Sequence, residues 1–429
     1  MLRVLWSVPV LLGLFVGQLP AQDNTELLNR MKAMEDRIKS LEAEVQALKG
    51  QPVAVALATP APAPAPAIVE PSPLEQAPIS LGGAGGMSKA LNPDVSVIGN
   101  FVAAAGNGAN RKIPSLEMKE TELGLQEIID PYARADFFIS FSEQGVNLEE
   151  GYMTFTGLPA HLQLQVGKMR AAFGRVNTMH THILPWIDRP LMTQDLLGGE
   201  DGINDAGFSL SRNIPAPKGI FLEGVTQLFR GDSTNTFQAN RRNDVSTVNH
   251  LHAYHDFSES TNIDLGASYA RGHSPFGDGS NQLFGGDVTI HWKPLRQSIY
   301  KSFVGRAEAT WARTTVGTLN TRGTAKPFGF YVSGDYQLAR RWFLGGRFDR
   351  SERGACLATN PSTTTPCFIP SSTALLQDTG GSLVLSYRPT EFSQIRGQLR
   401  RNHYGEGLTA NELIFQFLFI IGAHGAHPF

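Results

Sequence analysis

The chain has 429 residues, a formal net charge of −2 and a charged fraction of 18 %, below the roughly 25 % of ordinary soluble domains. This balance offers no large basic surface, so we expect no nucleic-acid partner. Two cysteines exclude a disulfide scaffold, and the lack of a CxxC motif argues against a structural zinc module. Beyond the N-terminus no apolar run reaches the ~20 residues of a membrane helix, which excludes a helical transporter.

Residues 1–21 have the pattern of a secretory signal peptide. Arg3 gives the basic start, residues 4–16 are apolar, and a cleavage site follows Ala21. The apolar stretch is short for a membrane span, although an uncleaved anchor is the alternative. In an exported chain we expect Cys356 and Cys367 to form a disulfide that braces their loop, the alternative being two free thiols.

Residues 22–50 predict a short α-helical coiled coil, because apolar residues recur in steps of four and three. The seam consists of Leu27, Met31, Met34, Ile38, Leu41, Val45 and Leu48. Since a lone helix of this length is marginal in water, the seam indicates a homo-oligomer. Its residues do not separate a dimer from a trimer, and we expect a trimer; an amphipathic helix packed on the rest of the chain is the alternative. Residues 51–90 are a linker, first rich in Pro and Ala and then in Gly.

Residues 91–429 predict an all-β fold, a transmembrane antiparallel barrel of about sixteen strands. Stretches of about ten residues alternate apolar and polar side chains between turn residues, as in outer-membrane barrels. Short and long connections also alternate. The expected strands are 94–105, 115–128, 132–143, 147–156, 161–172, 203–212, 219–230, 245–258, 261–272, 282–294, 299–313, 327–338, 341–351, 377–388, 391–403 and 410–429.

The last strand carries the sharpest signal. Leu413, Phe415, Phe417 and Phe419 form an apolar face, and the terminal Phe429 has the same parity. A terminal aromatic in phase with a lipid-facing strand resembles the signal that the outer-membrane assembly machinery recognises. We therefore expect that machinery and the lipid bilayer of a Gram-negative outer membrane as partners; the alternative is an edge strand of a soluble sandwich.

Charged residues two apart on these strands share a face and cannot face lipid cheaply, so they predict a polar lumen. The structural alternative is a set of ion pairs bracing the wall. The expected pore-lining residues are Arg134, Asp136, Lys168, Arg170, Arg306, Glu308, Arg347, Asp349, Arg396 and Arg400.

The long connection 173–202 is the third external loop by this count. In general porins the third loop folds into the pore, so we expect a constriction here. Acidic residues outnumber basic ones in it, which predicts a mild cation preference against Arg-bearing walls; a solvated acidic loop is the alternative. Its charged residues include Asp188, Arg189, Asp195, Glu200 and Asp201.

Two HxH pairs are candidate metal ligands. His180 and His182 lie in the long connection, and His250 and His252 lie on the eighth expected strand. On a strand such a pair shares one face, so two imidazoles and a carboxylate can hold a metal. For each pair taken alone, the more common alternative is that its histidines only line a polar lumen and bind no metal.

Catalytic motifs are missing: the sequence has no GxSxG, P-loop, HExxH or GxGxxG before a helix. We therefore expect no enzyme and no cofactor.

Residues 167–175 (GKMRAAFGR) resemble a strand-end motif of phosphate-selective porins, a superfamily that the coil and the strand number also resemble. The runs 180–190 (HTHILPWIDRP), 197–202 (LGGEDG) and the ending 422–429 (GAHGAHPF) resemble the group called zinc-regulated TonB-dependent outer-membrane receptors. That resemblance implies a link to zinc and energised uptake. The coil and linker leave no room for the plug domain of such a receptor.

The predicted function is an outer-membrane porin for passive diffusion of small hydrophilic solutes or ions. The alternatives are a zinc-linked uptake protein and a non-conducting barrel that binds a partner at its surface.

Overall fold

The computed structural model describes Lys32, Lys39 and residues 93–108, 113–233, 236–275, 279–318, 321–354 and 374–422. The chain divides into two compact units, residues 1–74 and 75–429. Lys32 and Lys39 are helical and exposed. Otherwise the signal peptide, the coiled coil and the linker lie outside the described residues, as do Cys356, Cys367 and Phe429, so these expectations remain predictions. No helix among the described residues is long and apolar enough to span a membrane.

The second unit is built of β-strands that follow one another along the chain. They are β1 (Asp94–Gly106), β2 (Leu116–Asp130), β3 (Ala133–Ser142), β4 (Gly145–Phe155), β5 (Leu162–Arg170), β6 (Asn204–Asn213), β7 (Ile220–Phe229), β8 (Ser246–Ser258), β9 (Thr261–His273), β10 (Ser280–Trp292), β11 (Phe303–Thr318), β12 (Thr321–Ala325), β13 (Phe328–Ala339), β14 (Trp342–Gly354), β15 (Leu375–Thr390), β16 (Ser393–His403) and β17 (Thr409–Gly422). The described helical turns are η2 (Pro159–His161), η3 (Val176–Thr178), η4 (Thr181–Ile183), α2 (Leu191–Leu196) and η5 (Leu295–Gln297).

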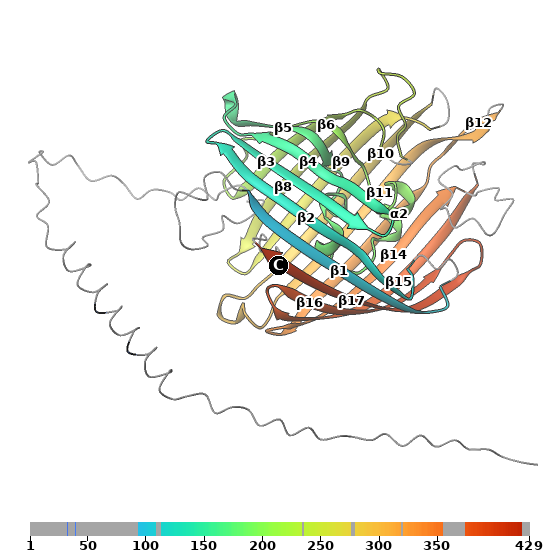
Figure 1. Cartoon of the computed structure of the whole chain (residues 1–429). Helices are drawn as coiled ribbons and strands as arrows, with labels where there is room; N and C mark the ends of the chain where they lie inside the picture. Colours follow the sequence, from blue (N-terminus) through green and yellow to red (C-terminus); the bar gives the residue numbers. More distant parts are fainter. Residues whose placement is uncertain are drawn as a thin grey trace, which may run out of the picture. The chain divides into compact units, whose positions relative to one another are not determined.

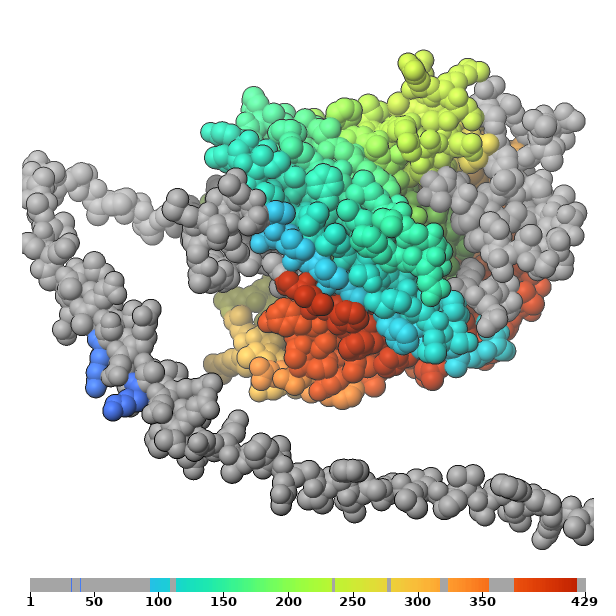
Figure 2. All heavy atoms as spheres, in the orientation of Figure 1, coloured from blue at the N-terminus to red at the C-terminus, as the bar shows by residue number. Residues whose placement is uncertain are grey.

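The strands form one closed antiparallel barrel. Apart from the β11–β13 region, each strand pairs with its neighbours in sequence, and β1 pairs with both β2 and β17, which closes the ring. β12 pairs only with the far end of β11, whereas β13 pairs with the first half of β11, so β12 extends a hairpin beyond a wall of sixteen strands. Figures 1 and 2 show the blue first strand beside the red last strand. The expected fold class is confirmed.

The outer face of the wall is apolar and the inner face is largely polar. On β17, Leu413, Phe415 and Ile421 are exposed, whereas Ile414 and Gln416 are fully buried. The same alternation places Phe284 and Trp311 outside and Glu308 inside. An apolar exterior around a polar interior is the pattern that a barrel wall in lipid requires.

Connections at one end of the barrel are short, and most of those at the other end are longer. Residues 131–132, 259–260, 340–341 and 391–392 join strands at the first end. The longest described connection, residues 171–203, joins β5 to β6 at the second end. We call it the inward loop, because it folds into the barrel, where α2 lies against β14 and β13 (Figure 1).

Candidate functional site

The inward loop fills part of the barrel interior with its own small core. It carries η3, η4 and α2, and most of its side chains are buried. Ala171, Phe173, Leu197 and Ile203 belong to one apolar cluster with wall residues of β7 to β11. A second cluster joins Leu184, Trp186 and Met192 to Tyr331 and Val384 of β13 and β15, and a third joins Ile187 to β1 and β17. The loop is therefore held on several sides of the ring.

The neck of the inward loop is closed by Asn177. Its amide nitrogen donates to the carbonyls of Ala171 (2.8 Å) and Ile203 (3.0 Å), and its amide oxygen accepts from the N–H of Ile203 (2.8 Å). One side chain thus ties together the two ends of the loop. Gly202 has φ +62°, and a Cβ there would lie 2.0 Å from Asn177 Oδ1, so glycine is required at this contact.

Glu308 on β11 anchors the start of the inward loop. Its Oε2 accepts from the backbone N–H groups of Arg175 (3.3 Å) and Val176 (3.2 Å). Gly174 has φ +61°, and a Cβ there would lie 1.8 Å from Glu308 Oε1. The first N–H groups of η3 have no partner within the helical turn, and they donate to the Glu308 carboxylate of the wall. From the sequence, Glu308 was expected in the pore lining.

Asp188 anchors the far side of the inward loop. Arg400 of β16 donates to its Oδ2 at 2.8 Å, Arg347 of β14 donates at 3.1 Å, and Gln398 donates to its Oδ1 at 2.6 Å. Burial alone raises the pKa of Asp188, but the two guanidinium groups lower it well below its usual value. Arg347 also pairs with Asp349 (2.7 Å). The carboxylate is therefore ionised and neutralised by the wall.

The other charged residues of the inward loop have different partners. Arg189 is buried and donates to the carbonyls of Val176 (2.9 Å) and Met179 (2.6 Å), and burial lowers its pKa to about 10. Glu200 pairs with Lys119 of β2 (3.1 Å). The carbonyl of Asp201 accepts from Arg170 (2.9 Å). Asp195 lies on α2.

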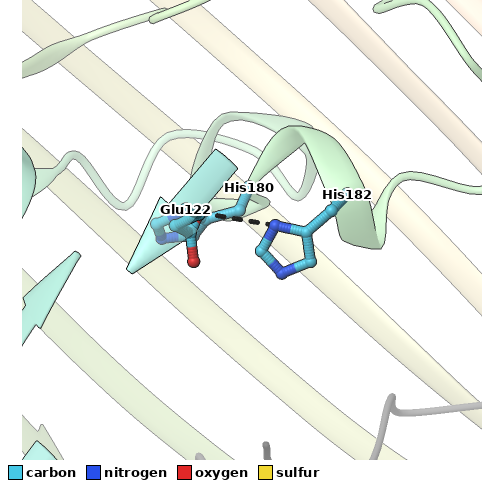
Figure 3. A group of neighbouring side chains, drawn as sticks. All are labelled: Glu122, His180 and His182. Atoms are coloured by element: carbon cyan, nitrogen blue, oxygen red, sulfur yellow. Dashed lines mark hydrogen bonds and ion pairs between the residues drawn. The ribbon is translucent and has the colours of Figure 1, made fainter. Parts of the chain in front are cut away.

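His180 and His182 lie beside the Glu122 carboxylate of the wall (Figure 3). His180 Nδ1 lies 3.0 Å from Glu122 Oε2 on β2, and its Nε2 lies 2.7 Å from Glu150 Oε2 on β4. His182 Nδ1 lies 3.4 Å from Glu122 Oε2. Burial alone lowers the pKa of His180, but hydrogen bonds to the surrounding carboxylates outweigh burial and raise the pKa well above its usual value.

His250 and His252 lie on the inner face of β8, with rings stacked 6.4 Å apart. His250 Nδ1 contacts Ser268 (2.8 Å), and His252 Nε2 contacts Asp264 (2.8 Å). Among the described residues, only Glu122, His180 and His182 bring three ligand atoms within 4.8 Å of one another. The structure thus distinguishes the two HxH pairs.

The remaining expected wall residues face the interior, with one exception. Arg134 pairs with Asp136 (2.7 Å), and Arg306 pairs with Asp335 of β13 (2.5 Å). Arg396 is buried and donates to the carbonyl of Trp186 in the inward loop (3.1 Å). The guanidinium of Arg170 is buried against Glu149 (2.8 Å).

Lys168 differs from the expectation. It is in register with Ala206 of β6, an exposed residue on the same face as the outward Phe208, and it donates to the carbonyl of Leu148. Since partners in register share a face, Lys168 lies on the outside of the barrel. Arg170, two residues later, ends β5 next to the inward loop, and there the chain leaves the regular wall.

Sequence reasoning missed Glu122, Glu149, Glu150 and Asn177. The Glu-x-Glu at 120–122 on an expected strand and the adjacent pair 149–150 were available as signals. No signal in the sequence pointed to Asn177, because its hydrogen-bond partners lie at the two ends of a loop whose path the sequence does not reveal.

No family model matches the chain. An uncharacterized protein of Aquifex aeolicus (strain VF5) is 28 % identical over 395 residues, which cover 80 % of this chain and 81 % of that protein. An anion-selective porin from Comamonas acidovorans has a TM-score of 0.52 at 10 % identity, covering 77 % of this chain and 99 % of the other. OprB of Pseudomonas putida has a TM-score of 0.52 at 9 % identity, and the match covers 78 % of this chain and 95 % of OprB.

At these identities the two structures share a fold with this chain. The shared fold is a closed antiparallel β-barrel, which is the fold class that the sequence predicted. The narrower resemblance to zinc-regulated TonB-dependent receptors finds no support in these matches.

Proposed function

We propose that this protein is an outer-membrane porin through which small hydrophilic solutes or ions diffuse passively. The observation that carries the proposal is the inward loop, the third connection at its end of the barrel, held inside a closed wall of sixteen strands. A ring of this size encloses a lumen wide enough for water. A loop folded into this lumen narrows the passage.

The size limit is set by the inward loop. Glu308, Asn177 and Asp188 hold it at its start, its neck and its far side. Because these contacts are buried and use both charges and backbone groups, the loop keeps one position during solute passage. A fixed constriction sorts solutes by size.

Charge selectivity is expected to depend on the wall as much as on the acidic loop. Asp188 and Glu200 are each paired with a wall cation, which reduces the field that the loop projects. Charged groups of the wall that stay partly exposed, such as Glu223 of β7 in register with His252 of β8, then contribute to the field inside the lumen.

Location and assembly follow the same proposal. The apolar outer face fits the lipid bilayer of a Gram-negative outer membrane. The coil at 22–50 is proposed to hold the chains together as trimers on the periplasmic side. Phe429 is proposed as the contact with the assembly machinery.

The test is single-channel current of the refolded, oligomeric protein in a planar bilayer under a KCl gradient. Stable conductance with an ion preference supports the porin. Absence of conductance from folded protein contradicts it and favours the alternative of a filled, partner-binding barrel, which the contacts of the inward loop on several sides of the ring also fit.

A further inference from the structure

The contact between the inward loop and strands β2 and β4 contains more ligand atoms than an ion pair needs. His180 Nδ1 lies 3.0 Å from Glu122 Oε2 and 3.3 Å from Glu149 Oε2. His182 Nδ1 lies 3.4 Å from the same Glu122 oxygen. Two imidazoles therefore converge on the Glu122 carboxylate, with Glu149 beside His180, and every one of these side chains is buried.

The spacing of these atoms matches the edges of a tetrahedral metal site. Ligands about 2.0–2.1 Å from a zinc ion lie about 3.3–3.4 Å from one another in a tetrahedron. The two imidazole nitrogens lie 3.0 and 3.4 Å from Glu122 Oε2, close to this value, and ligand atoms of all three residues lie within 4.8 Å of one another. An ion pair explains a short contact between His180 and one carboxylate, whereas the convergence of His182 on the same oxygen fits a shared ion.

The second nitrogen of His180 is held as in a metal site. Glu150 Oε2 lies 2.7 Å from Nε2, which leaves Nδ1 facing Glu122 and Glu149. Glu150 is itself held, because its Oε1 accepts from the backbone N–H of Arg170 (2.7 Å). Metal-ligating histidines usually contact a carboxylate or carbonyl through the other ring nitrogen. The Phe138 ring packs 4.9 Å from the His180 ring and limits its rotation.

We propose that His180, His182 and Glu122 form a binding site for a divalent transition-metal ion of the zinc type. Mixed imidazole and carboxylate ligands favour such ions, whereas magnesium and calcium prefer sites made of oxygen alone. The site joins two residues of the inward loop to Glu122 on β2. A bound ion therefore cross-links the loop to the wall.

The consequence for the channel rests on the proposed function. With the ion bound, the inward loop is fastened to β2 as well as at its Asp188 anchor, and the constriction is rigid. Without the ion, His180 holds the loop through its hydrogen bonds to the carboxylates alone. We expect zinc to reduce the conductance or its fluctuations.

The test is equilibrium dialysis of the full-length protein in detergent, stripped with a chelator and then exposed to zinc or magnesium, with metal analysis. We expect one tightly bound zinc per chain and no comparable binding of magnesium. The variants His180→Gln and His182→Gln lose this zinc. Glu150→Gln, which keeps an acceptor for Nε2 but not the charge, weakens binding about 10- to 100-fold.

His250→Gln is the matched control, because His250 belongs to the other HxH pair and contacts Ser268 instead; its zinc content stays as in the unaltered protein. Each variant is first checked for the gel shift of a folded barrel. No zinc on the folded, unaltered protein, or zinc retained by both His180→Gln and His182→Gln, overturns the site. If the protein conducts but binds no zinc, the metal site is contradicted and the porin function still stands. If it binds zinc but does not conduct, the porin function is contradicted and the metal site still stands.

Discussion

The carboxylate of Asp188 lies 2.8 Å from the guanidinium of Arg400, which follows it by 212 residues in the chain. Arg400 also donates to Glu412 of β17. An acidic residue expected to project charge into the pore is instead the point at which the inward loop is fixed to the last strands of the barrel. Removing its charge should therefore affect the position of the loop before it affects ion preference.

Asp188→Asn should loosen the inward loop. The substitution leaves Arg347 and Arg400 without their shared carboxylate, and breaking a buried ion pair costs about 3–5 kcal/mol. We expect a lower unfolding temperature and a larger, noisier single-channel conductance. Asp201→Asn is the control, because the backbone carbonyl of Asp201 and not its carboxylate contacts Arg170. An unchanged conductance in Asp188→Asn would show that this anchor does not hold the constriction.

Gly174→Ala should displace the start of the inward loop from β11. A left-handed backbone costs a non-glycine residue about 1–2 kcal/mol, and the new Cβ meets Glu308. We expect increased conductance and easier thermal unfolding. Gly381→Ala on β15 is the control, since nothing lies within 4 Å of its Cβ position. Equal behaviour of the two variants would contradict the role given to Glu308.

Asn177→Ala should open the neck of the inward loop. The N–H of Ile203 loses its partner, at about 1–3 kcal/mol, while the carbonyls of Ala171 and Ile203 each keep a backbone donor. We expect trypsin to cleave after Arg175 faster than in the unaltered protein, as measured by mass spectrometry of the fragments. Asn213→Ala, at the exposed end of β6, serves as the control. Resistance to trypsin equal to that of the control would argue against a clamp at Asn177.

Acid should release the inward loop only at very low pH. The pKa of Asp188 is lowered in the folded protein, so its contribution is fully present above the ordinary value of about 3.9 and is lost as pH falls through the lowered value. We expect the part of the conductance that depends on Asp188 to stay constant from pH 7 to about pH 4. The measurement compares the unaltered protein with Asp188→Asn across this range. A difference between them that disappears near pH 5 would contradict the lowered pKa.

The wall could be predicted because its signal is local. Alternation of Leu413 and Phe415 with Ile414 and Gln416 shows in the sequence which residues face out, and the structure confirms it. The partners of the inward loop could not be predicted, since Asp188 and Arg400 meet only after the ring has closed. Lys168 was misplaced because residues two apart, such as Lys168 and Arg170, share a face only in a regular strand. β5 ends at Arg170.

The most direct test of the central claim is the single-channel conductance of the folded protein before and after the inward loop is shortened. Residues 179–199 are replaced by a short Gly-Ser linker, which leaves Asn177 and its partners in place. We expect a small, steady conductance in the unaltered protein and a several-fold larger one in the shortened protein. Equal conductances from two correctly folded barrels would contradict the claim that this loop is the constriction.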